Sequence, residues 1–286
     1  MGPATAGRLE APRLGVSGKT LWKKVRRIWA TFGLLATVVF AFWMYFGYRA
    51  SSFAVAAMRT DPNVIVSSGD GVIRFTPPAS VLKKQPVGLL FFAGAVVDPR
   101  AYAPMGHDLA LAGYPVTIVP LPRRGMFGGA ESPELMTVAT EAMNLDERVS
   151  QWIVGGHSRG AVVAIKFEEL VRTMGANTLA GLLLVGTTHP RDVDLSKIKL
   201  SVTKIVGTND GVAPITKVDA NRHLLPATTH WVRIEGGNHS QFGWYGFQPG
   251  DHFASISRDA QHMQLVTAIK ESLRVAAELH SPLAPP

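Results

Sequence analysis

The sequence predicts an α/β protein whose mostly parallel central sheet has helices on both faces and is preceded by one transmembrane helix. From residue 87 onward, short and continuously apolar runs alternate with helical patterns, which is typical of buried parallel strands joined by helices. A run of 21 uncharged residues lies near the N-terminus. Apolar residues form 47% and charged residues 17% of the 286 residues, which excludes a disordered or fibrous chain.

The uncharged run extends from Ile28 to Tyr48, long enough to cross a bilayer core of about 30 Å. Its ends carry aromatic residues of the kind that favour a membrane interface, namely Trp29, Trp43, Tyr45 and Tyr48. Basic residues are more frequent before the run than after it. This bias predicts a cytoplasmic N-terminus and an extracytoplasmic domain.

A cleaved signal peptide is the alternative, because Ala54-Val55-Ala56 resembles a cleavage site. The apolar run is longer than the usual signal-peptide core of roughly 7–15 residues, and the small residues lie well beyond it. These two features favour an uncleaved signal anchor. Cleavage would instead release a secreted domain.

The charge distribution separates the chain into segments. Residues 1–27 carry +6 of the net charge of +8 and form a basic cytoplasmic tail. The membrane segment at 28–48 and a linker at 49–61 follow, and residues 62–286 form one domain. Because this domain is nearly neutral, nucleic acid is excluded as a partner. The sequence does not define an oligomeric state.

The domain is expected to begin with a hairpin, Asn63–Ser68 and Val72–Thr76, which turns at Gly69-Asp70-Gly71. Strand and helix patterns alternate after it. The expected strands are Val87–Phe92, Val116–Val119, Trp152–Val154, Ala180–Val185, Ser201–Val206 and Trp231–Ile234. The expected helices are Pro99–Ala112, with Asp98 as N-cap, then Arg159–Met174 and Asp259–Leu279.

A candidate nucleophile lies in Gly156-His157-Ser158-Arg159-Gly160, which fits G-x-S-x-G. The motif directly follows one expected strand and opens a helix. A serine on such a sharp turn has an exposed hydroxyl. Side chains two residues before and after it would collide, so Gly156 and Gly160 are required. His157 is expected to pack beneath the site.

A serine nucleophile needs a base and an acid that orients the base. Asp210 follows the strand at 201–206, and His239 follows the strand at 231–234. The order Ser158, Asp210, His239 is the order of α/β hydrolase triads. Asp192 and Asp194 follow an earlier strand and are alternative acids.

Two backbone N–H groups are expected to hold the oxyanion. Arg159 contributes one, because it opens the helix after the serine. Ala95, in the loop after the strand at 87–92, is the candidate for the other, although this loop is also consistent with an ordinary strand-to-helix turn.

Five segments together resemble the alpha/beta hydrolase superfamily, and most closely its single-domain, dienelactone-hydrolase-like branch. They are FFAGAVVDPRAY (91–102), GYPVTIVPLP (113–122), GGHSRGA (155–161), GTNDG (207–211) and IEGGNHSQFGWYG (234–246). The resemblance covers about residues 62–280. It implies that Ser158 is the nucleophile, His239 the general base and Asp210 the orienting acid, with Ala95 and Arg159 in the oxyanion hole.

The sequence departs from this branch in two respects. Dienelactone hydrolases use a cysteine nucleophile, and this chain has no cysteine, so their substrate is not carried over. Arg159 is cationic at a commonly apolar or Gln-like position. Its side chain either favours an acidic substrate or pairs with a nearby carboxylate.

Two loops border the expected site. The aromatic residues of 241–246 either wall the acyl pocket or pack within the loop, and residues 123–129 are a candidate flap. No long insertion suggests a large lid, so the pocket is expected to be open and modest in size, which disfavours a true lipase.

No metal-binding or nucleotide-binding motif occurs, and the predicted mechanism needs no metal or cofactor. The sequence thus predicts a membrane-anchored serine hydrolase that cleaves small-molecule or lipid-like carboxylic esters or thioesters. An acyltransferase with the same triad and a non-catalytic binding module are the alternatives.

Overall fold

The computed structural model describes residues 18–78 and 87–280, together with Gly2 and Val81. The chain divides into two compact units, Met1–Phe46 and Gly47–Pro286. Helix α1 (Gly18–Gly47) occupies the first unit and ends at the first residue of the second. Its apolar part is long enough to span a membrane, and none of that part is buried against other described residues. A signal sequence near the N-terminus has the same length and composition.

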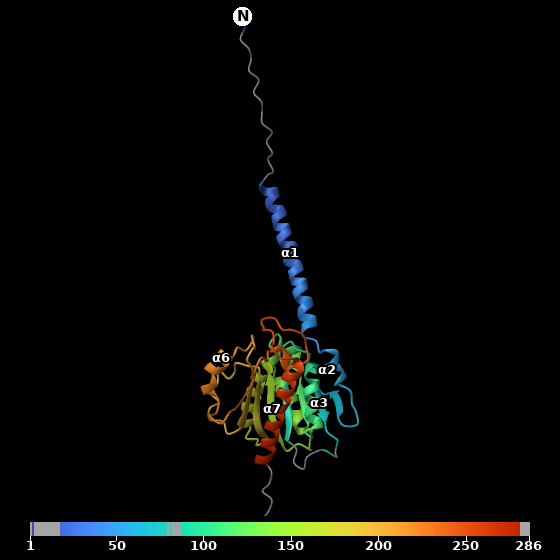
Figure 1. Ribbon diagram of the computed structural model, residues 1–286, viewed down its shortest axis with the longest axis vertical. Coiled ribbons are helices and arrows are strands. Elements are labelled where there is room, and N and C mark those ends of the chain that lie inside the picture. Colours follow the sequence, from blue (N-terminus) through green and yellow to red (C-terminus); the bar gives the residue numbers. More distant parts are fainter. Residues whose placement is uncertain (1, 3–17, 79–80, 82–86, 281–286) are drawn as a thin grey trace, which may run out of the picture. The chain divides into compact units, whose positions relative to one another are not determined.

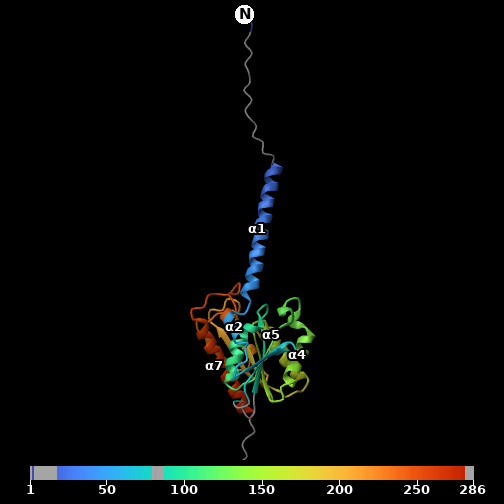
Figure 2. The same ribbon diagram turned by 90° about the vertical axis from the view of Figure 1, so that its right-hand side faces the viewer.

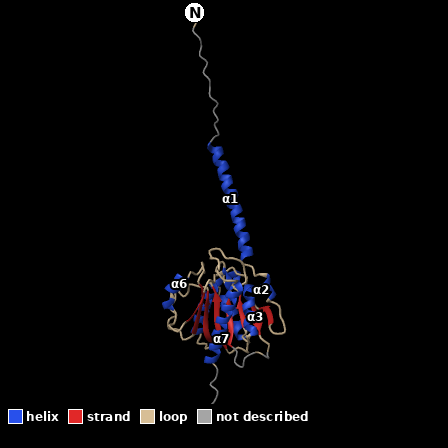
Figure 3. Ribbon diagram, in the orientation of Figure 1, coloured by secondary structure: helices blue, strands red, loops and turns tan. Residues whose placement is uncertain are grey.

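The second unit is built on an eight-stranded sheet with the order β1-β2-β4-β3-β5-β6-β7-β8. Figure 3 shows the strands of this sheet in red. Strands β3 to β8 are parallel, and β2 pairs antiparallel with both β1 and β4. The strands are β1 (Ile65–Gly69), β2 (Val72–Thr76), β3 (Val87–Phe92), β4 (Val116–Val119), β5 (Gln151–His157), β6 (Leu179–Val185), β7 (Ser201–Gly207) and β8 (His230–Ile234). The predicted fold class of the domain, a mostly parallel sheet with helices on both faces, is confirmed.

The hairpin forms because both central residues of its turn adopt left-handed backbone angles. Asp70 has φ 51° and Gly71 has φ 76°, as a type I′ turn requires. This turn matches the twist of the paired strands β1 and β2.

Helices cover both faces of the sheet (Figures 1 and 2). Helices α3 (Ala103–Leu111) and α7 (Arg258–Leu279) pack on one face, and α4 (Pro133–Asn144) and α5 (Arg159–Thr173) pack on the other. The expected helix at 99–112 is divided into a 3-10 turn, Pro99–Tyr102, and α3. Asp98 caps this turn as expected, since its carboxylate accepts from the Arg100 N–H at 3.1 Å.

Three helices of the structure were not predicted from the sequence: α4, α2 (Ser52–Ala56) and α6 (Ile215–Ala220). Helix α2 lies within the expected linker. Its Ala54 is fully buried, and its N-cap Ser51 accepts from the Ala54 N–H.

The carboxyl ends of β3 to β8 lie at one edge of the sheet because these strands are parallel. We call this edge the carboxyl edge. The loops that leave it carry Ala95, Ser158, Asp210 and His239, and the candidate site is therefore built there.

Candidate active site

Ser158 lies between the end of β5 and the start of α5, with φ 55° and ψ −117°. This conformation is rare for a residue with a side chain and is found mainly where function requires it. The Ser158 N–H donates to the carbonyl of Val185 at 2.9 Å, which ties the turn to the neighbouring strand β6. The strand–turn–helix context expected for the motif is present.

The two glycines of this turn have no space for a side chain. A Cβ on Gly156 would lie 2.3 Å from the carbonyl carbon of Gly160. A Cβ on Gly160 would lie 2.1 Å from the carbonyl oxygen of Phe92. The second contact brings the start of α5 against the end of β3, next to the loop that carries Ala95.

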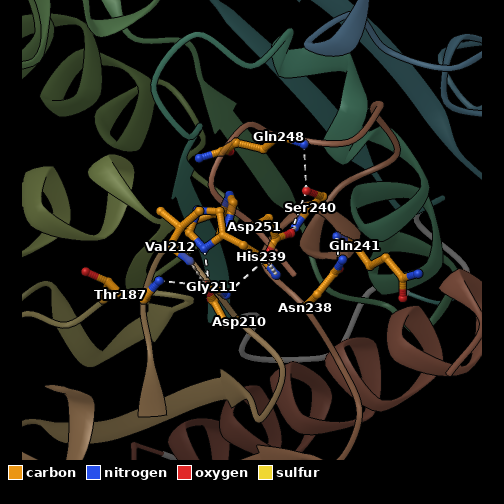
Figure 4. Close-up of polar contacts among 12 residues, drawn as sticks. Thr187, Asp210, Gly211, Val212, Asn238, His239, Ser240, Gln241, Gln248 and Asp251 are labelled. Atoms are coloured by element: carbon orange, nitrogen blue, oxygen red, sulfur yellow. Dashed lines mark hydrogen bonds and ion pairs between the residues drawn. The ribbon is translucent and has the colours of Figure 1, made fainter. Parts of the chain in front are cut away.

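Asp210 and His239 are in direct contact (Figure 4). The Oδ2 atom of Asp210 lies 2.8 Å from Nδ1 of His239, and both side chains are 1% exposed. The other carboxylate oxygen of Asp210 accepts the backbone N–H groups of Val212 and Ala213, at 2.9 and 2.6 Å. These bonds hold the carboxylate in one orientation toward the imidazole.

The alternative acids lie elsewhere. The side chain of Asp192 is 81% exposed and faces His189 and Arg191. Asp194 accepts the N–H of Ser196, two residues along the chain, at 2.8 Å. Of these three carboxylates, Asp210 is thus the one that the structure places at the imidazole of His239.

Ser158 and His239 line the same cavity, of about 220 Å³, at the carboxyl edge. The Nε2 atom of His239 is buried and has no hydrogen-bond partner among the described residues. Since Nδ1 is held by Asp210, Nε2 is the nitrogen that remains for proton transfer. A larger cavity of about 580 Å³ lies elsewhere, between the end of α5 and residues 194–200.

His157 packs beneath the site, as expected. It is fully buried, and its ring centroid lies 4.5 Å from that of His239. The Tyr102 hydroxyl accepts the Gly94 N–H at 3.0 Å and shares a second hydrogen bond with Nδ1 of His157, at 2.9 Å. Burial lowers the pKa of His157 well below its ordinary value, and His239 adds to this effect. A neutral imidazole supports the floor of the site.

The loop from 94 to 96 leaves one N–H free. The Gly94 N–H donates to Tyr102, and the Val96 N–H donates to the carbonyl of Arg124 at 2.7 Å. Within the described residues, the N–H of Ala95 has no acceptor. Arg159 is the first residue of α5, so its N–H has no acceptor within that helix. Both predicted oxyanion donors are therefore available at the carboxyl edge.

The side chain of Arg159 forms an ion pair with Glu131. The sequence left two interpretations of this side chain, an acidic substrate or a nearby carboxylate, and the structure shows the carboxylate. Two other basic residues line the cavity, His189 and Arg191. Burial, assisted by the charge of Arg191, lowers the pKa of His189 to about 4. His189 is therefore neutral at pH 7.

The aromatic residues that follow His239 pack within the domain rather than lining the cavity. Phe242 is 2% exposed and its ring lies 5.6 Å from His157. Trp244 packs against Phe53 at 4.1 Å, and Tyr245 is 3% exposed. Of the two alternatives for these aromatic residues, all three follow the packing alternative, and none walls the pocket.

The candidate flap at 123–129 contacts the loop of Ala95 but does not line the cavity. Arg123, Arg124 and Phe127 all have positive φ angles, between 49° and 53°. Such angles are uncommon for residues other than glycine, so this loop is conformationally strained.

Asp251, which no sequence motif identifies, connects the two loops that carry the acid and the base (Figure 4). Its carboxylate accepts five hydrogen bonds. The Oδ1 atom accepts the N–H groups of Gly211, His239 and His252, at 3.1, 3.2 and 2.9 Å. The Oδ2 atom accepts the N–H and hydroxyl of Ser240, at 2.7 and 2.6 Å.

Gln261 holds the His239 loop from the side of α7. It is fully buried, accepts the N–H of Asn238 at 3.0 Å and donates to the carbonyl of Asn238 at 2.7 Å. Neither Gln261 nor Asp251 belongs to a recognisable motif. Their role becomes apparent only from the folded loops.

The substitution Asp251→Asn is expected to reduce kcat about 10- to 100-fold while changing KM for a small ester less than about threefold. An amide cannot accept all five hydrogen bonds, and each buried N–H left unpaired costs about 1–3 kcal/mol. The loops at Gly211 and His239 would then shift relative to each other. Steady-state kinetics checks this, with Asp194→Asn, also a loop aspartate that accepts a backbone N–H, as the matched control. Equal losses in both variants would contradict a positioning role for Asp251.

Among the described residues, no cluster of three or more histidine, aspartate or glutamate side chains is arranged to hold a metal ion.

Comparisons with known proteins agree with this architecture. A family model described as the alpha/beta hydrolase family matches residues 88–263, a range that includes Ser158, Asp210 and His239. No curated protein matches the chain significantly.

Several solved structures are similar in fold. An esterase from Pyrobaculum calidifontis is 15% identical, with a TM-score of 0.57, over 79% of this chain and 90% of its own. A protein described as a predicted CIB-like hydrolase from Thermoplasma acidophilum is 14% identical, with a TM-score of 0.52, over 73% and 98%. A fungal esterase from Rhizomucor miehei is 13% identical, with a TM-score of 0.50, over 80% and 91%.

These identities show similarity of fold alone, and the dienelactone-hydrolase-like branch stays a prediction. The family match, in contrast, covers more than half of the chain. On this basis the chain belongs to the alpha/beta hydrolase family.

Proposed function

We propose that the protein is a membrane-anchored serine hydrolase that cleaves carboxylic esters or thioesters through an acyl-enzyme on Ser158. The observation that carries this proposal is the contact between Asp210 and His239, with Nε2 of His239 unpaired in the cavity that Ser158 lines. The esterases with similar folds support the same class of reaction.

In this mechanism the Ser158 hydroxyl attacks the substrate carbonyl and its proton passes to Nε2 of His239. Asp210 holds the tautomer with the proton on Nδ1 and stabilises the imidazolium that forms. The N–H groups of Ala95 and Arg159 stabilise the oxyanion.

Collapse of the tetrahedral intermediate releases the alcohol or thiol, which takes the proton from His239. Water then attacks the acyl-enzyme and gives a proton to His239. As the second tetrahedral intermediate collapses, His239 returns this proton to the Ser158 oxygen and the acid leaves. The reaction written in this way requires neither a redox partner nor a metal.

We also propose that residues 28–48 are an uncleaved anchor, with the N-terminus in the cytoplasm and the domain outside. The residues around the possible cleavage site pack into the domain: Ala54 is fully buried, and Tyr48 is 6% exposed and stacks on Tyr245. Tyr48 thus lies in the domain core, whereas its position at the end of the apolar run predicts a place at the membrane interface. Cleavage after Ala56 would remove these residues.

The test is covalent labelling of the full-length protein in detergent with a fluorophosphonate, followed by peptide mass spectrometry. The expected result is one adduct on Ser158, together with hydrolysis of p-nitrophenyl esters from acetate to decanoate. Folded protein that neither reacts with the probe nor hydrolyses any ester would contradict the proposal and favour a binding module. Acyl transfer to an added alcohol, in the near absence of free acid, would instead indicate an acyltransferase.

A further inference from the structure

Residues 47–51, which begin at the last residue of α1, form hydrogen bonds with loops at the carboxyl edge. The carbonyl of Gly47 accepts the N–H of Gly246 at 2.7 Å, and the carbonyl of Tyr48 accepts the N–H of Asp98 at 2.9 Å. The N–H of Ser51 donates to the carbonyl of Trp244 at 2.7 Å. Residues 47–51 therefore lie between the loop that follows His239 and the loop that follows Ala95.

This attachment fixes where the chain enters the domain. Gly47 is both the last residue of α1 and a hydrogen-bonded residue of the second unit. Whatever direction α1 takes, its end is held at the carboxyl edge. The chain that leads from the apolar run of α1 therefore enters the second unit at the carboxyl edge, through Gly47.

The same edge exposes large apolar side chains. Phe127 is 85% exposed and Phe253 is 82% exposed, the highest values among the large apolar side chains of the described residues. Phe127 follows β4, and Phe253 follows β8 and stacks on Phe247 at 4.8 Å. Both loops leave the sheet at its carboxyl edge.

Basic residues accompany these phenylalanines. Arg123 and Arg124 are exposed and lie in the same strained loop as Phe127. Aromatic side chains beside arginine or lysine are typical of surfaces that bind the interface of an anionic membrane. Moving a phenylalanine ring from water into lipid is favourable, because it removes apolar surface from water.

We propose that the carboxyl edge rests on the lipid surface from which the anchor emerges, with Phe127 and Phe253 inserted, and that the substrate is an ester of a membrane-held amphiphile. This proposal rests on the proposed function and on the apolar part of α1 spanning the membrane. The site cavity of about 220 Å³ is smaller than the roughly 300–1,000 Å³ of most ligand pockets. It accommodates the reacting ester, and a long apolar tail remains in the lipid.

Depth in the membrane can be measured without any hydrolysis. The chain has no cysteine, so Phe127→Cys, Phe253→Cys and Met174→Cys each give a single labelling site for a bimane fluorophore. Met174 is 66% exposed and follows α5 at the opposite edge of the sheet. The full-length proteins are placed in phosphatidylcholine–phosphatidylglycerol vesicles that contain doxyl-labelled lipid.

The expected result is at least twofold quenching of the labels at 127 and 253 and none at 174. Equal quenching at all three positions, or none at 127 and 253, would overturn the proposal. Labels at 127 and 253 that are shielded from water but not quenched would indicate a protein partner and would also overturn it. Because this readout does not depend on catalysis, an inactive enzyme would contradict the proposed function and the substrate class, but not the contact of the carboxyl edge with lipid.

The substrate class is tested with the double variant Phe127→Ser/Phe253→Ser and the matched control Leu145→Ser/Met174→Ser, whose residues follow α4 and α5. In vesicles, the first variant is expected to lose at least tenfold activity on a bilayer-embedded fluorogenic diacylglycerol. It should retain its activity on soluble p-nitrophenyl acetate, and the control should retain both. Equal losses on both substrates, or no loss on the embedded ester, would overturn the inference.

Discussion

Replacing Ser158 by alanine is expected to lower kcat for p-nitrophenyl acetate by a factor of about 10⁴–10⁶ and to leave the fold intact. The serine oxygen forms the covalent bond to the acyl group, and alanine has no atom that replaces it. Residual turnover would come from the oxyanion donors and from substrate binding, which still act on a water molecule.

The fold should survive because alanine preserves the interactions that build the turn. The backbone N–H at position 158 still donates to the Val185 carbonyl, and the Cβ atom is unchanged. Thermal unfolding in detergent is therefore expected within a few degrees of the unaltered protein.

Ser67→Ala, at an exposed position of β1, is the control and should be fully active. Activity of Ser158→Ala within tenfold of the unaltered protein would show that another residue is the nucleophile. Loss of both activity and folded structure would instead assign Ser158 to the stability of the turn.

Much of the fold could be predicted from the sequence because its strands are short, apolar and separated by strong turn signals. The run Val87–Phe92 is buried at every residue of β3, as expected for a central parallel strand. Helix α4 was not predicted although Ser132-Pro133 is a helix start signal. Its moderate apolar pattern gives a weaker signal than the buried strands on either side of it.

The candidate site was predictable only in part. The order of Ser158, Asp210 and His239 follows from chain topology, since each residue comes directly after a strand of one parallel sheet. The ion-pair partner of Arg159, in contrast, could not be predicted from the order of the strands. Glu131 is far from it in sequence, and only the packing of the loop after β4 against α5 brings the two together.

The positioning role of Asp251 is even less predictable from the sequence. Its five hydrogen bonds depend on the exact course of the loops after β7 and β8, and no periodicity or motif encodes that course. A lone aspartate before His252 in a loop is most simply interpreted as a turn residue. Positioning residues of this kind are therefore found from the structure.

The substitution Asp210→Asn is expected to lower kcat by a factor of about 10⁴ at pH 7, again with little effect on stability. The amide oxygen of asparagine can still accept the N–H groups of Val212 and Ala213. Its NH₂ group then faces Nδ1 of His239, where the carboxylate oxygen now lies at 2.8 Å.

That exchange reverses the roles of the imidazole nitrogens. An NH₂ donor requires Nδ1 to accept, so the proton of the neutral ring moves to Nε2. A protonated Nε2 cannot take the proton of Ser158, and the base is lost although every heavy atom stays in place. The loss should fall on kcat rather than on KM, because substrate binding does not involve this hydrogen bond.

The matched controls are Asp192→Asn and Asp194→Asn, which alter the two carboxylates that the sequence leaves as alternative acids. Both should retain activity within about twofold, because neither side chain contacts His239. A loss of less than tenfold in Asp210→Asn, or a large loss in either control, would show that the carboxylate at His239 does not set its tautomer. The catalytic role of His239 would then have to depend on a different partner, and Asp251, whose carboxylate accepts the backbone N–H of His239, would be the first to test.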